Sequence, residues 1–226
     1  MACSQCAVEN HAEPTSLERV RYFPRQLLTA DDMRTEQEYF REKLRRHNRF
    51  LHGWGVVCGL EVVRDPVQAM KVKVCPGYAL GPWGDEIYVE EPAELDLSYC
   101  ARPPAAPCDP QHGGVVQPIG RVVVLLVKIR YAQCPSRPMR TLPAGCGCDE
   151  TACEYSRIRD GFEIQCAVKG TAPTPRPRDI NQEVPACPPC PTDPWIVLAE
   201  VETTGAFTIR NEVRRVIANT PALAGS

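Results

Sequence analysis

Residues 29–63 read TADDMRTEQEYFREKLRRHNRFLHGWGVVCGLEVV, and the periodicity of this stretch determines the fold class. Six positions recur at alternating spacings of four and three, which places them on one side of a helix: Met33, Gln37, Phe40, Leu44, His47 and Leu51. Beyond Gly55 the apolar residues follow a period of two, which is typical of a strand. The stretch therefore predicts one amphipathic helix followed directly by β structure.

The ends of this helix are marked by residues that commonly cap helices. Thr29, followed three residues later by Asp32, matches a capping-box-like start, and Gly53 tolerates the left-handed conformation that ends many helices. We therefore expect a helix over residues 29–52. His47 and His52 are five residues apart, about 140° around an α-helix, so we expect their rings not to share a face.

A helix with a single apolar side needs a surface to cover that side. Either a partner subunit or the chain's own sheet can supply this surface. From the stripe and the aromatic residue that follows it, we predict an interface formed by Phe40, Leu44, His47, Leu51 and Trp54.

The remainder of the chain alternates short strand patterns with long irregular segments. Strands are predicted at residues 56–63, 70–75, 78–80, 86–90, 121–131, 158–168 and 195–201, whereas residues 207–216 fit a strand or a short helix. Long loops rich in Cys or Pro are predicted at residues 101–118, 135–157 and 169–194. The prediction is a β-rich α+β protein: an extended N-terminal arm (residues 1–28), the helix (29–52) and an antiparallel β-sandwich-like domain (53–220).

Charge and hydropathy exclude two classes of partner as the main target. The longest fully apolar run has only six residues (122–127), too short to span a membrane. The formal net charge of −2 gives no overall attraction to nucleic acid. The N-terminus shows no basic stretch followed by an apolar one, so we expect synthesis in the cytoplasm.

The chain has 13 Cys, an odd number, so they cannot all form internal disulfides. In a reducing compartment, Cys clusters are more often metal ligands than bridges. The first candidate zinc site is Cys134, Cys146, Cys148 and Cys153, four thiols around one loop. Disulfides, or thiols that are simply buried, are the alternatives for this loop.

A second candidate structural zinc site combines Cys187 and Cys190, which have the C-x-x-C spacing, with Cys166. Cys100 and Cys108 are possible further partners. The same spacing occurs in redox motifs, but those precede a helix that lowers the thiolate pKa. Here several Pro and a predicted strand follow, so a structural role is favoured over thiol redox chemistry.

Common catalytic signatures are missing from the sequence. It contains no P-loop, no His-Glu-x-x-His and no Gly-x-Ser-x-Gly motif. The paired carboxylates, such as Asp31 and Asp32, are better explained as helix caps or loop charges, because adjacent side chains point apart. We therefore expect a non-enzyme.

Five stretches resemble structural proteins found with phage-tail-like contractile injection systems. They are residues 22–29 (YFPRQLLT), 36–47, 52–62 (HGWGVVCGLEV), 74–87 (VCPGYALGPWGDEI) and 153–160 (CEYSRIRD). The resemblance implies a structural or adaptor subunit at the baseplate or fibre-attachment region, with no catalytic residues. It also implies an oligomeric state, other subunits of the tail-like assembly as partners, and a particle that can be released from the cell.

Two other classes of function compete with this interpretation. The first is a free-standing zinc-binding protein whose Cys loops bind a partner. The second, less favoured, is a thiol oxidoreductase.

Overall fold

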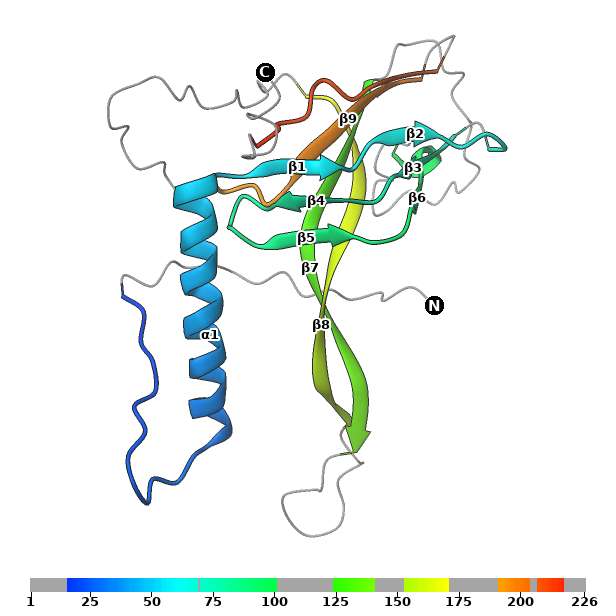
Figure 1. Ribbon diagram of the computed structural model, residues 1–226. Coiled ribbons are helices and arrows are strands. Elements are labelled where there is room, and N and C mark those ends of the chain that lie inside the picture. The colour runs from blue at the N-terminus through cyan, green and yellow to red at the C-terminus, as the bar shows by residue number, and fades with distance from the viewer. Residues whose placement is uncertain are drawn as a thin grey trace, which may run out of the picture.

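The computed structural model describes residues 16–68, 70–100, 124–140, 153–170, 191–203 and 207–217. In this part of the chain one long helix stands at the side of a β body, and a long two-stranded ribbon extends from the body in the same general direction as the helix (Figure 1). Residues 16–29 form no helix or strand. The predicted loop 101–118, most of the predicted loop 169–194 and the first half of the predicted arm lie outside the described residues.

Helix α1 spans Ala30–His47, and its start is the one that the sequence predicts. The Thr29 hydroxyl accepts a hydrogen bond from the Asp32 backbone N–H, while the Asp32 carboxylate accepts one from the Thr29 backbone N–H at 2.8 Å. This reciprocal pair satisfies two backbone donors that a helix start otherwise leaves open. One π turn, η1 (Asn48–His52), continues α1 to Gly53, whose φ of 78° ends it.

Six short strands form the first layer of the body as two antiparallel sheets, β1-β4-β5 and β2-β3-β6. Their bounds are β1 Gly55–Gly59, β2 Val62–Arg64, β3 Lys71–Val74, β4 Gly77–Leu80, β5 Glu86–Val89 and β6 Ala93–Asp96. Each strand of one sheet continues along the chain into a strand of the other, so the two sheets are halves of one interrupted meander. A short 3-10 turn, η2 (Leu97–Tyr99), follows β6.

Where the meander is interrupted, the backbones at the end of β1 and the start of β4 come very close together. Gly59 has φ of 62°, and a Cβ on it would lie 2.2 Å from the Pro76 carbonyl oxygen. A Cβ on Gly77, its partner across β1 and β4, would lie 2.4 Å from the Leu60 backbone nitrogen. Only glycine fits at both positions, because any side chain would push the two strands apart.

The second layer is a four-stranded antiparallel sheet in the order β10-β9-β7-β8. Its strands are β7 Val124–Arg140, β8 Cys153–Val168, β9 Ile196–Glu202 and β10 Thr208–Arg210. The prediction of a loop over 135–157 is therefore wrong at both ends, because residues 135–140 and 153–157 are paired strand. β9 pairs with β7 only as far as Ile129, so the outer part of β7 is an edge, where its prolines are tolerated.

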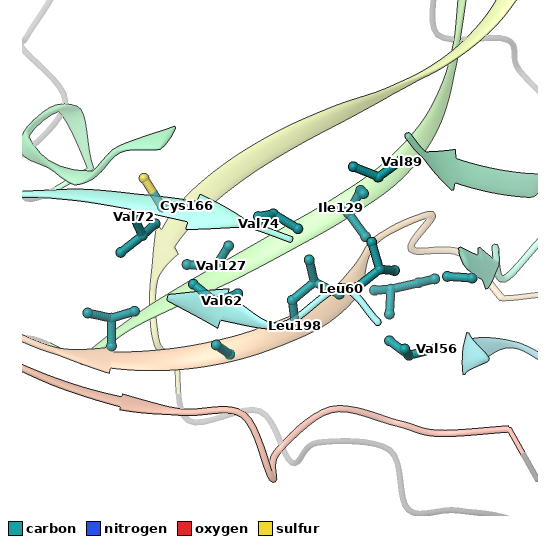
Figure 2. Packing of buried hydrophobic residues seen from close by; sticks show 14 of the residues in the cluster. Val56, Leu60, Val62, Val72, Val74, Val89, Val127, Ile129, Cys166 and Leu198 are labelled. Carbon is teal, nitrogen blue, oxygen red and sulfur yellow. The ribbon is translucent and has the colours of Figure 1, made fainter. Parts of the chain in front are cut away.

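The hydrophobic core lies between these two layers (Figure 2). Leu125, Val127 and Ile129 alternate along β7 and are fully buried, as are Val72 and Val74 of β3. Burying a side chain of this size stabilises the fold by about 1.5–3 kcal/mol. The described strands therefore support the predicted two-layer, β-rich arrangement.

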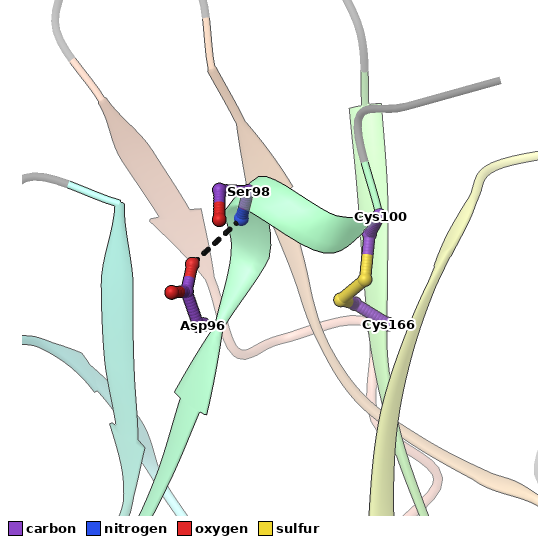
Figure 3. The surroundings of a disulfide bond; sticks show 4 residues. All are labelled: Asp96, Ser98, Cys100 and Cys166. Atoms are coloured by element: carbon purple, nitrogen blue, oxygen red, sulfur yellow. Dashed lines mark hydrogen bonds between the residues drawn. A yellow bond between two sulfur atoms is a disulfide. The ribbon is translucent and has the colours of Figure 1, made fainter. Parts of the chain in front are cut away.

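A disulfide between Cys100 and Cys166 joins the end of η2 to β8 and so links the two layers (Figure 3). The Asp96 carboxylate accepts a hydrogen bond from the Ser98 backbone N–H at 2.9 Å, which caps η2 just before Cys100. Cys166 is buried, and its sulfur is used in this bond.

Removal of this disulfide tests how much it contributes to stability. Because the bond closes a loop with a sequence separation of 66 residues, the Cys100→Ala/Cys166→Ala variant should lose about 2–4 kcal/mol of unfolding free energy in urea. The matched control is Cys58→Ser, an exposed thiol outside the bond. Equal stability of the chain with and without a reductant would contradict the assignment.

The acid stability of the β2–β3 turn should depend on Asp65. Its carboxylate accepts hydrogen bonds from the backbone N–H groups of Val67 and Gln68 and lies 3.1 Å from the Lys73 ammonium, which together lower the pKa of Asp65 to about 2. A folded-state pKa below the unfolded value of about 4 stabilises the fold above that pH. This contribution is lost as the pH falls from about 4 to about 2.

Urea unfolding at neutral pH and at about pH 3 measures the effect. Asp65→Asn should be less stable at neutral pH and should lose less on acidification than the parent chain. Glu94→Gln, which changes the more exposed partner of Lys73, is the control and should behave like the parent. An unchanged acid dependence in Asp65→Asn would contradict this account.

Candidate interaction surface

The apolar side of α1 is exposed along its whole length. We call Met33, Gln37, Phe40, Leu44, His47 and Leu51 the helix stripe. All six side chains are exposed, with Phe40 at 60%, Leu44 at 50% and Leu51 at 69% of their full accessible surface. The sequence leaves open whether a partner subunit or the chain's own sheet covers the stripe. In the part of the chain that the structure describes, the sheet does not cover it.

A small polar cluster fixes the C-terminal end of this helix to the body. The Arg45 guanidinium donates from Nε to Asp85 at 2.6 Å, and both side chains are 6% exposed. The Asn48 amide donates to the Gly84 carbonyl oxygen at 2.9 Å. We call Arg45, Asn48, Gly84 and Asp85 the helix anchor; Arg45 and Asn48 are the buried residues of α1 and η1.

The anchor places the helix backbone directly against the β4–β5 turn. Gly84 has φ of 92°, and a Cβ on it would lie 2.2 Å from the Arg45 carbonyl oxygen. Both the backbone conformation and the space therefore require glycine at this position.

Charge pairing compensates for burial at the anchor. Burial alone would lower the pKa of Arg45, but the charge of Asp85, its hydrogen bond and the nearby Glu42 raise the pKa overall. Glu42 lies 2.5 Å from the second guanidinium nitrogen and is partly exposed. Because a buried charge without its partner is costly, this pair constrains where the helix can stand.

The π turn changes the relation between the two histidines at the end of the helix. The rings of His47 and His52 lie 5.4 Å apart between centroids, so the prediction that they do not share a face is wrong. In a π turn the hydrogen bonds run between residues five apart, which places such residues near one another.

Trp54, predicted as an interface residue, differs from the helix stripe in its surroundings. It is partly buried and packs against the core cluster. The Arg215 guanidinium lies 4.2 Å from the centroid of its ring. Trp54 therefore makes contacts inside the chain, where it helps to hold the segment that follows η1.

Exposed apolar residues also occur on the segment that precedes the helix. Tyr22, Phe23 and Leu27 are exposed, and the Tyr22 hydroxyl donates to the Glu36 carboxylate. This hydrogen bond holds the segment beside α1, next to the helix stripe. The exposed apolar surface therefore extends beyond the helix itself.

The strand register separates two of the thiols proposed for the first zinc site. Cys134 pairs with Arg159 and Cys153 with Arg140, so the two Cys positions are six residues apart along the ribbon. At about 3.3 Å per residue this is about 20 Å, far more than the ligands of one ion allow. The four-thiol set is therefore wrong as a set, and Cys146 and Cys148 lie outside the described residues.

The second zinc site is also wrong as predicted, because Cys166 is bonded to Cys100. Cys187 and Cys190 lie outside the described residues. Among the residues that the structure describes, no three His, Cys, Asp or Glu side chains group closely enough to hold a metal ion. Zinc bound by the remaining thiols stays a prediction.

The sequence reasoning missed the helix anchor. Gly84 and Asp85 belong to a segment that predicts only a Gly-rich turn, and Arg45 is one of several basic residues on a charged helix. No local pattern connects residues 40 positions apart, so their pairing is visible only in the fold.

Comparisons with known proteins add little to this geometry. No family model matches the chain, and the search of curated proteins finds no match. A solved structure, the type VI secretion system TssK-TssF-TssG baseplate subcomplex, contains a chain similar at 12% identity with a TM-score of 0.42. The match covers 86% of this chain and 60% of that one, and at this level it carries no argument about function.

Within the residues that the structure describes, none of the helices combines the length and the apolar character needed to cross a bilayer.

The helix anchor can be tested by removing its acidic partner. Asp85→Ala leaves the Arg45 charge buried without its main partner, which should cost about 3–5 kcal/mol. Hydrogen exchange should show lost protection in α1 and η1. Glu42→Gln, a partly exposed partner of the same guanidinium, is the control and should cost less than about 1 kcal/mol. Equal effects of the two substitutions would contradict the role given to Asp85.

Proposed function

We propose that this chain is a non-catalytic structural or adaptor subunit of a multi-protein assembly of the contractile injection type. The main observation that supports this proposal is the helix stripe, an apolar surface exposed on a helix whose position is fixed by the helix anchor. The sequence resemblance to tail-associated proteins suggests the baseplate or fibre-attachment region as its place. In this proposal the chain is made in the cytoplasm and then built into a particle.

An exposed apolar stripe of this length favours association with a partner. Large exposed apolar patches on folded proteins mark interaction sites. Burial of apolar surface is favourable by about 25 cal/mol per Å². Since the helix is already ordered and fixed to the body, a partner that covers the stripe gains this energy without first ordering the segment.

The β7–β8 ribbon supplies a second surface that suits an assembly. Ile158 and Met139 lie on one face of the ribbon and are 66% and 59% exposed, and Tyr155 is exposed as well. A two-stranded ribbon is only marginally stable alone in water, so contact with a neighbour would stabilise it. Two separate exposed surfaces on one chain suit a subunit with more than one neighbour.

Fractionation of native particles by sedimentation tests the proposal. The tagged full chain should sediment with other subunits in a fast fraction. Leu44→Glu places a charge in the exposed stripe and should move the chain to the slow fraction, because the contact surface is no longer apolar. Arg46→Glu, exposed on another side of the helix, should sediment like the parent.

Two results would contradict the proposal. The first is a chain found in the slow fraction alone, with no co-sedimenting subunit. The second is an isolated monomer that converts a substrate at a useful rate. Circular dichroism of both variants confirms that the folded state is retained, as expected for substitutions of exposed side chains.

A further inference from the structure

We propose that the outer edge of β8, over residues 153–160, binds an extended acidic segment of another protein as an added strand. This inference deepens the proposed function and rests on it, because it names the chemistry of one neighbour in the assembly. Its evidence is the open backbone of this edge, the prolines that close the opposite edge of the ribbon, and two arginines without an acidic partner.

The edge is open along the part of the ribbon that projects from the body (Figure 1). β8 is the last strand of its sheet, so in the part of the chain that the structure describes no strand pairs with it on the outer side. Residues 153–160 are all exposed. We call the outer side of these residues the open edge. The unpaired N–H and C=O groups of such an edge can pair with another strand.

The opposite edge of the ribbon is poorly suited to such pairing. Beyond Ile129 the outer edge of β7 carries Pro135 and Pro138. Backbone donors of a strand alternate between its two sides, and these prolines are three residues apart, so one of the two leaves the outer edge without a donor. Arg137 between them has φ of 57°, far from strand values. β8 contains no proline, so strand addition is directed to the open edge.

Two positive charges stand beside the open edge. Arg157 and Arg159 are two residues apart in β8, so their side chains lie on the same face of the ribbon. Their partners across the ribbon are the uncharged Ser136 and Cys134. Neither guanidinium forms an ion pair with another residue that the structure describes. The two charges are therefore available to a partner.

The register of an added strand defines the residues that suit it. Residues directly opposite each other in neighbouring strands point to the same face, and opposite charges at such positions stabilise the pair. The positions opposite Arg157 and Arg159 therefore favour Asp or Glu. The position between them lies on the face of Ile158, which is 66% exposed, and favours an apolar residue. The expected segment has an acidic–apolar–acidic sequence.

This chain is a poor source of such a segment. The acidic–apolar–acidic sequence occurs in it at residues 94–96 and 200–202, which are already paired in β6 and β9. A second copy of β8 is also disfavoured. In an antiparallel pair of two copies centred on residue 157, 158 or 159, an arginine faces an arginine, and like charges directly opposite are destabilising. The occupant is therefore a different protein.

The ribbon is already held in shape for this contact. The Tyr131 hydroxyl donates to the Asp160 carboxylate at 2.5 Å, and the Ser156 hydroxyl donates to the Arg137 carbonyl oxygen at 3.0 Å. Both hydrogen bonds join β7 to β8 and lie on either side of the two arginines along the ribbon. A partner therefore gains affinity without first ordering the strand that it joins.

Peptide binding to the purified full chain tests the charge preference. The probe is a blocked eight-residue peptide of alternating Glu and Val, compared with one of alternating Lys and Val. The parent chain should bind the Glu peptide at least about fivefold more tightly, measured by fluorescence anisotropy. Arg157→Glu/Arg159→Glu should reverse this preference. Arg21→Glu/Arg46→Glu, which makes the same change in net charge at exposed positions outside the ribbon, should bind like the parent.

Hydrogen exchange resolved by NMR tests the mode of binding. The Glu peptide should slow the exchange of alternate amides within residues 153–160, those that point outward, and leave residues 135–140 unchanged. Binding without this protection would overturn strand addition, as would equal binding of the two peptides by the parent. Tighter binding of a single-stranded oligonucleotide, lost in Arg157→Glu/Arg159→Glu, would show that the arginines serve phosphate groups and would overturn the inference. Circular dichroism confirms that the variants are folded.

The result separates this inference from the proposed function. A chain that sediments with other subunits but does not bind the Glu peptide overturns the inference and supports the proposed function. Peptide binding with alternate amide protection, in a chain that sediments alone, supports the inference and contradicts the proposed function.

Discussion

The buried ion pair between Arg45 and Asp85 is the interaction on which the position of the helix depends. The core lies between the two layers of strands, and the helix contributes no residue to it. Its contacts with the body include one charge pair, the Asn48 amide bond and the close approach at Gly84. Each of these contacts is directional, unlike apolar packing. Together they therefore fix the angle between the helix and the body as well as the point of attachment.

The apolar residues of the chain fall into two groups, one that forms the core and one that remains exposed on the helix. The buried apolar residues of β7 and β9, on one layer, face those of β3 on the other and form the core that holds the body together. Those of the helix stripe lie outside the core and remain exposed. The disulfide and the glycine pair at β1 and β4 constrain the body further. A stable body that displays an unused apolar surface is a physical basis for assembly.

The parts of the fold that sequence could predict are those with local causes. Thr29, Asp32 and Gly53 act within one turn of the helix, so their residue types alone predict both of its ends. The π turn and the helix anchor could not be predicted, because they depend on contacts between distant segments. The outer ribbon resembles a loop in sequence because Pro135 and Pro138 usually interrupt strands, and the edge position that tolerates them is a property of the sheet. The two predicted ligand sets were wrong for the same reason, since strand register and the bond between Cys100 and Cys166 determine which thiols can meet.

Because α1 is fixed to the body at one end, it behaves mechanically as a cantilever. The 15 residues of α1 that precede Arg45 extend about 22 Å from the anchor. At that length a rotation of about 10° at the β4–β5 turn displaces the start of the helix by about 4 Å, somewhat less than the rise of one helical turn. A small backbone rotation around Gly84 therefore produces a larger displacement at Met33. The stiffness of the β4–β5 turn determines how precisely the start of the helix is positioned.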